Sequence, residues 1–479
     1  MGADLPTAPV HGRLHPQIPR PVGLCCEIER LSAYLTDSGL FHLTVKRSQR
    51  PRGGVHSVSF KAVRGFKDIL PGEVPRWIHA ENTARRIFRA FGFQEIRPPM
   101  LEYVEVFTRG IGQHTDIVEK EMYAFTDKNG ENVCLRPEAT GGVLRAVIEN
   151  GLANESPILR LFTLGPMFRH ERPQKGRLRQ FHQMNSEVIG SHSPRADAEV
   201  IWLAWEILRA CSSAELILDI NSLGCPVCRP TYRRVLQDFL EKNAGDLCQD
   251  CARRRMTNPL RVLDCKNEVC KSIVALAPHM ETYLCPACAG HHEKVREALD
   301  SIGIPSRDNP FLVRGLDYYV RTAFEISSPV LGAQSTVAAG GRYDGLLKAM
   351  EGPDLPGVGM AVGLERLLLL EEGPNVSVSS TGPDLFVAYL DDESFNIALP
   401  WILEWRRRGI SVLLPHETAG LKTFMKQADR AHARFVFIVG EEERTRREGI
   451  LRDMATRRQS PIPFDSAVAA VATILEETL

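Results

Sequence analysis

A run of basic residues between two strand-like segments constrains the fold more than any other feature of the chain. Residues 157–171 (PILRLFTLGPMFRHE) and 179–190 (RQFHQMNSEVIG) have the composition of strands, and Arg172, Lys175 and Arg177 lie between them. Two such segments joined by a polar loop are typical of an antiparallel hairpin. The sequence therefore predicts two antiparallel strands whose connecting loop is positively charged.

The charge and length of the chain limit its partners and its organisation. Its 479 residues include 59 Lys and Arg against 59 Asp and Glu, which disfavours a general polyanion binder and leaves local basic patches as the route to nucleic acid. No apolar run approaches the roughly 18 residues of a membrane span, and the N-terminus lacks the apolar core of a secretory signal. We therefore expect a cytoplasmic protein of two or three domains without membrane contact.

Hydrophobic periodicity divides the first half of the chain. Residues 1–55 show no sustained period, which indicates either a leader without stable structure or a start codon assigned too early. Apolar residues from Val74 to Phe91 fall on one helical face, and Gly92 is a natural stop for that helix. Residues 91–102 read as a strand interrupted by prolines, at a sheet edge or an interface.

The second half of the chain shows three further features. Residues 197–211 (DAEVIWLAWEILRAC) are predicted to form a helix. Residues 373–383 (GPNVSVSSTGP) have the composition of a linker. Beyond this linker, segments alternate strand, helix, strand, helix, strand, which predicts a small α/β domain with parallel strands over residues 384–479.

Three arginines are candidates for phosphate binding. Arg169 ends a predicted strand, Arg366 lies in the first turn of a helix that follows glycine-rich backbone, and Arg314 lies in a segment that reads as a strand. A planar guanidinium on a rigid element suits phosphate oxygens, and a buried arginine needs an anion such as a triphosphate. The chain contains no P-loop, so phosphate binding of that kind is not expected. The alternative for the basic loop is a solvated turn.

Carboxylates and tyrosines form a second candidate site. Glu138 and Thr140 are two residues apart and share a face if the segment is extended, and Glu187 follows a strand pattern. Carboxylates without lysine partners in apolar strands indicate a cationic ligand such as an amino group or an imidazole; structural ion bridges are the alternative. Tyr318 and Tyr319 lie in the same strand-like segment as Arg314, and packing is the commoner role of tyrosines in strands.

Eight of the 12 cysteines lie between residues 225 and 288. They form three C-x-x-C pairs and one pair with four intervening residues: Cys225/Cys228, Cys248/Cys251, Cys265/Cys270 and Cys285/Cys288. A C-x-x-C turn directs two thiolates at one tetrahedral ion, and separate pairs favour zinc over an iron–sulfur cluster.

The distribution of these cysteines over metal ions stays open at this point. The first two pairs could form one site and the last two another, but the spacing does not determine the pairing. His291 and His292 could also replace a thiolate. Free thiols on a helical insert are the alternative to metal binding.

Five stretches taken together resemble histidyl-tRNA synthetases, which are class II aminoacyl-tRNA synthetases. The resemblance runs from about Phe66 to the end of the chain, interrupted only by the cysteine insert. The stretches FQEIRPPMLE, GPMFRHERPQKGRLRQFHQMNSE and GVGMAVGLERLLLLEE resemble motifs 1, 2 and 3 of the class, and VRGLDYY and AAGGRYDGL resemble two signatures of the histidine enzyme.

This resemblance implies a fold and a domain order. A class II core, an antiparallel sheet flanked by helices, is expected in residues 56–221 and 301–372. A cysteine-rich, helical zinc domain is expected as an insertion over residues 222–300, and an anticodon-binding domain over residues 384–479. Pro99 matches the proline of the family's dimer interface, so a homodimer is implied.

The resemblance also implies an activity: ATP-dependent activation of L-histidine to the adenylate, with Mg²⁺, and transfer to the 3′ end of tRNA(His). Arg169 and Arg366 would hold the α- and γ-phosphates of ATP, and Arg314 would reach the α-phosphate from the opposite side. The residues for histidine would be Glu138, Thr140 and Gln183 at the amino group, Glu187 and Tyr319 at the imidazole, and Tyr318 along the pocket wall.

Some expectations are less direct. Arg172 and Gln174 match loop positions that meet the tRNA acceptor end, and the basic stretch 251–261 suggests that the insert clamps the acceptor stem. The family commonly has a Gly or another small residue near the position of Asn185, so the resemblance does not determine the fine shape of the pocket. Rival interpretations are a non-catalytic, synthetase-like regulatory subunit of ATP phosphoribosyltransferase and a zinc-ribbon nucleic-acid binder. Retention of the three arginines and of the terminal domain favours the enzyme.

Overall fold

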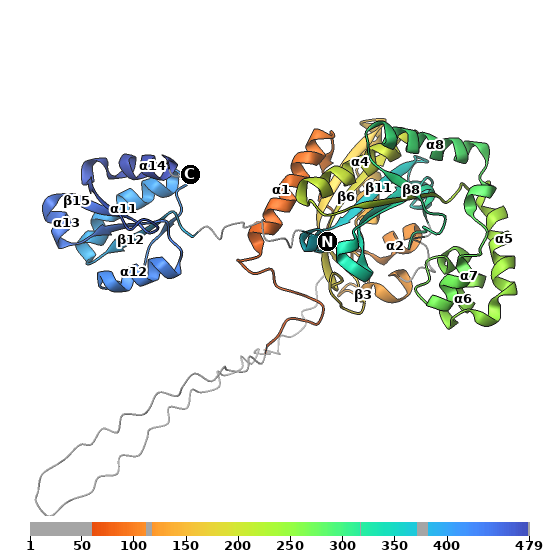
Figure 1. Ribbon diagram of the computed structural model, residues 1–479, viewed down its shortest axis with the longest axis horizontal. Coiled ribbons are helices and arrows are strands. Elements are labelled where there is room, and N and C mark those ends of the chain that lie inside the picture. The colour runs from red at the N-terminus through yellow and green to blue at the C-terminus, as the bar shows by residue number, and fades with distance from the viewer. Residues whose placement is uncertain (1–59, 112–116, 317, 371–381, 478–479) are drawn as a thin grey trace, which may run out of the picture. The chain divides into compact units, whose positions relative to one another are not determined.

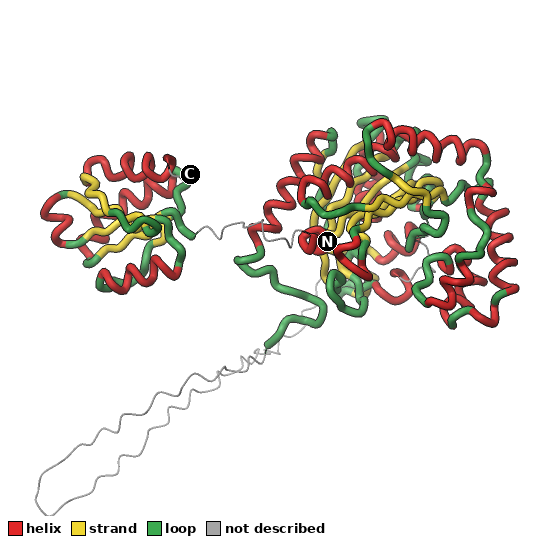
Figure 2. The backbone as a smooth tube through the Cα atoms, in the orientation of Figure 1, coloured by secondary structure: helices red, strands yellow, loops and turns green. Residues whose placement is uncertain are grey.

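The computed structural model describes residues 60–111, 117–316, 318–370 and 382–477 (Figures 1 and 2). The expected leader, residues 1–55, and most of the expected linker, residues 373–383, lie outside the described residues. Residues 60–370 contain a large sheet, a small sheet and the cysteine insert, and residues 382–477 contain a second α/β unit. No helix in these described ranges is both long and apolar enough to cross a bilayer.

An eight-stranded sheet forms the centre of residues 60–370, in the strand order β1-β5-β6-β11-β10-β9-β7-β8. Neighbouring strands are antiparallel except at the two edges, where β1 pairs with β5 and β7 with β8 in parallel. The predicted antiparallel sheet is therefore confirmed for strands β5, β6, β11, β10, β9 and β7, whereas the two edge strands make the sheet mixed. The strands are β1 (Gln94–Glu95), β5 (Leu159–Phe168), β6 (Gln180–Ile189), β7 (Ile217–Ser222), β8 (Ser306–Asp308), β9 (Val320–Ser327), β10 (Thr336–Arg342) and β11 (Gly357–Gly363).

The predicted basic hairpin is β5 and β6, whose register runs from Leu159 opposite Ile189 to Phe168 opposite Gln180. The loop between them places Arg169 directly after β5. On the other side, β6 pairs with β11, so that Glu187 lies opposite Gly359. The hairpin thus forms the second and third strands of the sheet and carries both the arginine and the carboxylate.

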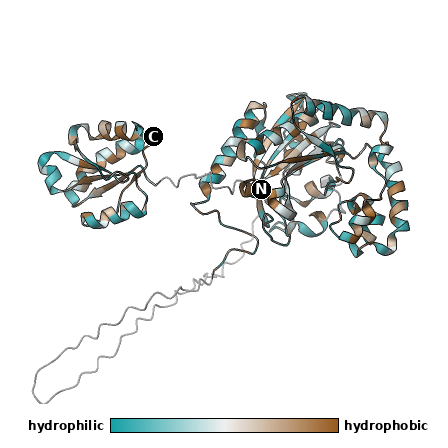
Figure 3. Ribbon diagram, viewed as in Figure 1, coloured by the Kyte–Doolittle hydropathy of each residue, from teal (hydrophilic) through white to brown (hydrophobic). Residues whose placement is uncertain are grey.

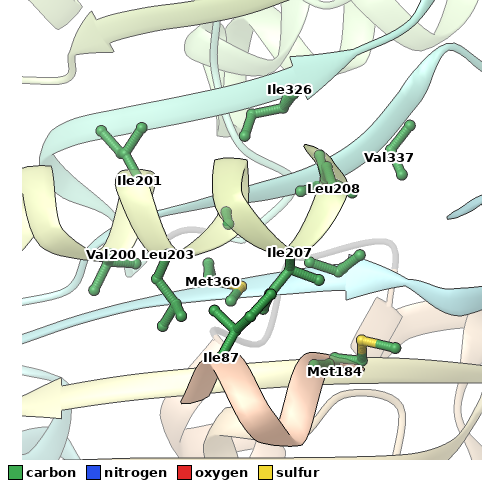
Figure 4. Packing of buried hydrophobic residues seen from close by; sticks show 14 of the residues in the cluster. Ile87, Met184, Val200, Ile201, Leu203, Ile207, Leu208, Ile326, Val337 and Met360 are labelled. Carbon is green, nitrogen blue, oxygen red and sulfur yellow. The ribbon is translucent and has the colours of Figure 1, made fainter. Parts of the chain in front are cut away.

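Two long helices pack on this sheet through one hydrophobic cluster, α1 (Val74–Ala90) and α4 (Pro194–Cys211). Figure 4 shows side chains of α4 together with Ile87 of α1 and Met184 of β6. The helix α1 ends as predicted, since Gly92 has a φ of 76° that few other residues adopt. The helix α4 begins earlier than predicted because Ser193 accepts a hydrogen bond from the Arg195 N–H at 3.3 Å and Pro194 follows the cap.

Smaller elements complete this part of the chain. A three-stranded sheet has the order β2-β4-β3, and the prolines of the segment 91–102 separate β1 from β2, as predicted. These elements are β2 (Leu101–Tyr103), α2 (Val104–Ile111), β3 (Tyr123–Thr126), β4 (Asn132–Leu135), α3 (Thr140–Glu149), α9 (Leu346–Ala349) and α10 (Leu364–Leu370).

The cysteine-rich segment lies between β7 and β8 and is helical, with a hydrophobic cluster of its own that includes Tyr232, Leu236 and Val262. The last of its helices also reaches the main core, where Val295 and Leu299 join the cluster of α4. Its helices are α5 (Arg229–Lys242), α6 (Gln249–Thr257), α7 (Glu268–Val274) and α8 (Pro286–Ser301).

Residues 382–477 form a five-stranded sheet in the order β13-β12-β14-β15-β16 with helices around it. Figure 3 shows its strands mostly brown and the outer faces of its helices teal. The elements are β12 (Leu385–Tyr389), α11 (Asp392–Arg407), β13 (Val412–Leu413), α12 (Leu421–Arg430), β14 (Phe435–Val439), α13 (Glu441–Arg446), β15 (Glu448–Asp453), β16 (Gln459–Pro463) and α14 (Ala467–Glu477).

The three strands predicted for this domain are parallel, as expected, but the sheet has two further strands that were not predicted. The strand β12 pairs in parallel with β13 and β14, but β14 with β15 and β15 with β16 are antiparallel. The last two strands form a hairpin, which needs no crossover helix. Its turn is stabilised by the Asp453 carboxylate, which accepts hydrogen bonds from the N–H groups of Ala455 and Thr456 at 2.8 and 2.9 Å.

Candidate functional site

A cavity of about 1350 Å³ lies over the large sheet and is lined by both the sheet and the cysteine insert. It brings together residues that are far apart in the sequence. The predicted residues that line it are Glu138, Thr140, Arg169, Gln183, Arg314, Tyr318, Tyr319 and Arg366. The insert contributes basic residues and two cysteines to the wall: Cys248, Arg254, Arg261, Cys265, Lys266 and Lys271.

Arg169 is held at the end of strand β5 of the hairpin. Its Nε donates a hydrogen bond to the Pro137 carbonyl at 2.8 Å, and its guanidinium lies 5.3 Å from the centre of the Phe181 ring. Its Nη1 is 4.0 Å from a carboxylate oxygen of Glu171. These contacts orient the planar group on a strand end, as a phosphate-binding arginine requires.

Arg366 approaches the cavity from the first turn of α10. Its Nε donates to the Gly176 carbonyl at 3.1 Å and its Nη1 to the Thr336 carbonyl at 2.7 Å. Burial, together with the neighbouring cation Arg177, lowers the pKa of this guanidinium. An anion in the cavity would therefore find a cation whose charge is only partly compensated by its surroundings.

Arg314 is the third arginine of the cavity. Its Nη1 lies 3.4 Å from Glu325, its guanidinium is 5.7 Å from the centre of the Tyr319 ring, and its buried Nε has no hydrogen-bond partner in the described structure. The expectation that Arg314, Tyr318 and Tyr319 lie within a strand is wrong, because β9 begins only at Val320. The Tyr319 carbonyl instead accepts a hydrogen bond from the Arg229 side chain, outside the strand ladder.

The buried Glu138 marks the acidic side of the cavity. Its two carboxylate oxygens accept hydrogen bonds from the N–H groups of Thr140 and Gly141, both at 2.7 Å. The expectation of an extended segment here is wrong, since Thr140 begins α3 and the carboxylate satisfies N–H groups that have no partner within the helix. Burial raises the pKa of Glu138.

Glu187 lies directly behind the cavity wall and is 2% exposed. One oxygen accepts a hydrogen bond from the Thr140 hydroxyl at 2.7 Å, and the other accepts one from the Tyr343 hydroxyl. Burial raises the pKa of Glu187 to about 8. The facing strand leaves room only for glycine, since a Cβ on Gly359 would lie 1.9 Å from the carboxylate.

Sequence reasoning missed Tyr343, although the stretch AAGGRYDGL that contains it was singled out. This tyrosine lines the cavity and is 1% exposed, so its hydroxyl is a fixed donor to Glu187. The signal available in the sequence was a single tyrosine after a glycine pair. Nothing local indicated its partner, 156 residues away.

Unsatisfied polar atoms on β6 point to a ligand. The Gln183 Oε1 and the Asn185 Nδ2 are buried without a hydrogen-bond partner in the described structure, and both side chains line the cavity. Buried polar groups are nearly always paired in proteins, so such atoms indicate a place for a bound molecule or water. The rings of Tyr318 and Tyr319, whose centres are 4.6 Å apart, also line the cavity.

The two residues assigned to the tRNA acceptor end are not part of the cavity lining. Arg172 and Gln174 are exposed in the loop between β5 and β6. The loop is folded back on itself, since Gln174 and Arg177 exchange backbone hydrogen bonds of 3.0 and 2.9 Å. Their assignment therefore stays a prediction.

The eight cysteines of the insert form two clusters, and their pairing differs from the suggested one. Neither His291 nor His292 replaces a thiolate, since they bond Asp197 at 2.6 Å and Asp308 at 2.7 Å. The outer cluster consists of Cys225, Cys228, Cys285 and Cys288, and the inner cluster of Cys248, Cys251, Cys265 and Cys270.

The sulfur geometry of both clusters fits one tetrahedral ion each. With zinc–sulfur bonds of about 2.3 Å, neighbouring sulfurs would lie about 3.8 Å apart. Three Sγ–Sγ distances in the outer cluster are 3.7, 3.8 and 3.9 Å, and one in the inner cluster is 3.9 Å. A disulfide would need about 2.05 Å. Separate pairs bound to a multi-iron cluster would ligate different metal atoms, which this close spacing disfavours.

The fold and the cavity define a class of protein. An antiparallel sheet that carries arginines on three different elements beside a buried acidic pocket fits the core of a class II aminoacyl-tRNA synthetase. A family model described as histidyl-tRNA synthetase matches residues 65–367. The chain belongs to the histidyl-tRNA synthetase family, as the sequence predicted.

Individual relatives agree with this family over most of the chain. A histidine–tRNA ligase from Desulfatibacillum aliphaticivorans is 46% identical over 417 residues, which are 87% of this chain and 99% of that protein. One from Geobacter sulfurreducens is 48% identical over 402 residues, which are 84% and 97% of the two chains. The crystal structure of apo histidyl-tRNA synthetase from S. aureus is 32% identical, with a TM-score of 0.73 and coverage of 86% of this chain and 99% of that chain.

A structure titled as an ATP phosphoribosyltransferase regulatory subunit/histidyl-tRNA synthetase from Bacillus halodurans is also similar. Its TM-score is 0.58 at 20% identity, with coverage of 80% of this chain and 98% of that chain. At this identity the similarity concerns the fold alone. It therefore adds nothing in favour of the regulatory alternative.

Proposed function

We propose that the chain is a histidine–tRNA ligase that acts in the cytoplasm in two steps within the cavity over its large sheet. The carboxylate of L-histidine attacks the α-phosphorus of ATP, which enters with Mg²⁺, and pyrophosphate leaves. The histidyl-adenylate is then transferred to the terminal ribose of tRNA(His). The protein contributes mainly positioning and charge stabilisation, without forming a covalent bond.

The three arginines of the cavity are proposed to bind ATP. Arg169 would contact the α-phosphate from the strand end and Arg366 the γ-phosphate from the first turn of α10. Arg314 would face the α-phosphate from the opposite wall, where it stabilises the charge that develops on the phosphoryl oxygens. This role is supported by its buried Nε, which lacks a partner in the described structure, and by the place of Arg314 in the lining of the same cavity.

The acidic pocket is proposed to bind histidine. Glu138, Thr140 and Gln183 would receive the α-amino group, and the unsatisfied oxygen of Gln183 supports this. Tyr319 and Glu187 would read the imidazole, with Tyr318 along the pocket wall. Glu187 could act only through a small rearrangement or through Thr140 and Tyr343, because it lies behind the wall that these two residues form.

The remaining parts of the chain are proposed to bind tRNA. The exposed Arg172 and Gln174 would meet the acceptor end, and residues 384–479 would bind the anticodon. The insert would clamp the acceptor stem, which the cations Arg254 and Arg261 on the cavity wall support. Two zinc ions, one in each cysteine cluster, are proposed to hold the insert together.

A homodimer is proposed as the assembly. The small sheet exposes an apolar surface next to Pro99, which is unusual for a face left in water. The exposed residues are Met100, Leu101, Tyr103 and Phe125. Light scattering during gel filtration tests this, and a monomer at micromolar concentration would contradict it.

One observation carries the proposed activity: the guanidinium groups of Arg169, Arg314 and Arg366 lie around one cavity beside the acidic pocket. The experiment is histidine-dependent ATP–pyrophosphate exchange, with the other amino acids as controls. It is followed by aminoacylation of tRNA(His) with and without its extra 5′ guanosine. A chain that shows no exchange with histidine would contradict the proposal and revive the regulatory alternative.

The role of Arg314 is tested in the same assay. Arg314→Ala should lower kcat/KM by about 100-fold or more, which corresponds to roughly 3 kcal/mol of lost transition-state stabilisation. The matched control is Arg160→Ala on β5, since Arg160 pairs with Glu199 at 3.3 Å and does not line the cavity. An Arg314→Ala rate near that of the control would refute the assignment.

A further inference from the structure

The two cysteine clusters of the insert are nested, and this arrangement gives them different surroundings. The outer cluster joins the first and last parts of the insert, since Cys225 and Cys228 follow β7 and Cys285 and Cys288 begin α8. The inner cluster is closed within the insert, between residues 248 and 270. Only the outer cluster therefore lies where the insert leaves and rejoins the sheet.

The segment that carries Cys225 and Cys228 is hydrogen-bonded to the backbone next to the tyrosines of the proposed histidine pocket. The Leu223 N–H donates to the Arg321 carbonyl at 2.6 Å, and the Arg321 N–H donates back to the Gly224 carbonyl at 2.8 Å. Arg229, which follows Cys228, donates to the Leu223 carbonyl at 3.0 Å and also to the Tyr319 carbonyl. The backbone on both sides of Val320 is thus fixed by residues adjacent to the cysteines.

The helix that carries Cys288, α8, is connected to the same pocket by a buried polar network. One turn after Cys288, His291 bonds the Asp197 carboxylate at 2.6 Å. The same carboxylate accepts a hydrogen bond from Thr322 at 2.5 Å and pairs with Arg342, which is fully buried. Arg342 immediately precedes Tyr343, the donor to Glu187.

We propose that the metal ion of the outer cluster positions the histidine pocket, whereas that of the inner cluster does not. The outer ion would hold together the two chain segments that fix Tyr319 and Tyr343, whose rings both lie against that of Tyr318 in the pocket. The inner cysteines pack in the same hydrophobic cluster as Tyr319, but among the described residues they make no hydrogen bond to Tyr319 or Tyr343, and Cys248 and Cys265 line the cavity among the basic side chains of the insert. The inference rests on the proposed function for the identity of the ligand, histidine.

Metal content provides a test that does not depend on activity. Protein purified without added metal should contain two zinc ions per chain. Elemental analysis for both zinc and iron shows which of these metals is bound, since both form tetrahedral thiolate sites. The outer variant Cys228→Ser/Cys288→Ser and the inner variant Cys251→Ser/Cys270→Ser, both mutated at buried cysteines, should each retain one ion. Cobalt substitution monitored by visible spectroscopy counts the tetrahedral sites independently. Wild-type protein with fewer than two tetrahedral ions per chain in both measurements would overturn the proposal.

Pyrophosphate exchange then separates a positioning role from a general structural one. The outer variant should raise KM for histidine at least tenfold while KM for ATP changes less than threefold. The inner variant should leave both constants within twofold of wild type. Equal effects of the two variants on KM for histidine, or no effect of the outer one, would overturn the proposal.

A third variant covers the case in which the outer variant does not fold. Arg229→Ala removes the contact to the Tyr319 carbonyl but no cysteine. It should keep two zinc ions and raise KM for histidine about tenfold, with KM for ATP little changed. Unchanged KM for histidine would overturn the connection. Wild-type protein that binds two zinc ions yet shows no histidine-dependent exchange would instead refute the proposed function.

Discussion

The hydroxyl of Tyr343 offers the sharpest test of the histidine pocket, because its removal leaves the ring in place. The ring packs in a buried cluster and fills the space opposite Gly357, where a Cβ would come within 2.1 Å of it. Tyr343→Phe preserves this packing and deletes only the donor to Glu187. A carboxylate oxygen that already lies against Gly359 is then left without that partner.

The expected loss follows from the charge of the acceptor. Above pH 8, where the Glu187 carboxylate is ionised, its hydrogen bond from Tyr343 should contribute about 1.5–3 kcal/mol, as hydrogen bonds to charged groups do. At about 1.4 kcal/mol per tenfold change, KM for histidine should rise roughly 10- to 150-fold, while KM for ATP stays within threefold. The pKa of Glu187, which burial already raises to about 8, should rise further. Recognition by the ionised carboxylate should therefore require a higher pH in the variant.

The assay is pyrophosphate exchange at varied histidine concentration between pH 6 and pH 9. The matched control is Tyr389→Phe, which removes a hydroxyl bonded at 2.7 Å to the Pro415 carbonyl in the C-terminal unit. A Tyr343→Phe enzyme whose KM for histidine and pH profile equal those of this control would refute the reasoning. It would mean that Glu187 does not depend on Tyr343 for recognising the ligand.

Three further outcomes are expected. Because burial raises the pKa of Glu187 to about 8, the folded chain keeps a proton that the unfolded chain loses near pH 4.5. The free energy of unfolding should therefore decrease as the pH rises from about 4.5 to about 8, and urea unfolding of Glu187→Gln should show a smaller decrease. Asp197→Asn removes the main partner of the buried Arg342 and should cost about 3–5 kcal/mol in urea unfolding; a loss below 1 kcal/mol would contradict this. Trp405→Ala should destabilise the C-terminal unit by about 3–5 kcal/mol in calorimetry, since the indole is fully buried, whereas an unchanged transition would show that the cavity is refilled.

The pH dependence of the Asp197 network has the opposite sign to that of Glu187. Burial alone would raise the pKa of Asp197, but the hydrogen bond of His291 and the charge of Arg342 outweigh it, and the pKa lies below the usual 3.8. The network therefore stabilises the fold fully above pH 3.8, the ordinary pKa of the carboxyl, and this contribution is lost as the pH falls through the lower pKa of the folded state. The two buried carboxylates are distinguished by their neighbours, one having only hydroxyl donors and the other an arginine.

Local sequence patterns determined most of the secondary structure and the candidate residues. The hairpin of β5 and β6, the helix α1 with its glycine stop and the cysteine pairs each depend on spacing within a few residues, so periodicity and turn chemistry suffice to predict them. The arginines Arg169, Arg314 and Arg366 could be proposed because the motifs around them are long and specific. Whether each contacts its assigned ligand group stays a prediction.

Tertiary structure decided what the spacing left open. A C-x-x-C turn places two thiolates together, but which pairs share an ion depends on how α5, α6 and α8 pack, and the result joins the first pair with the last. Likewise, Glu138 lies at the start of a helix instead of in a strand because the N–H groups of Thr140 and Gly141 need an acceptor. The partner of Glu187, Tyr343, is 156 residues away in the sequence. The order of the strands in the sheet, and not the distance in sequence, brings such side chains together.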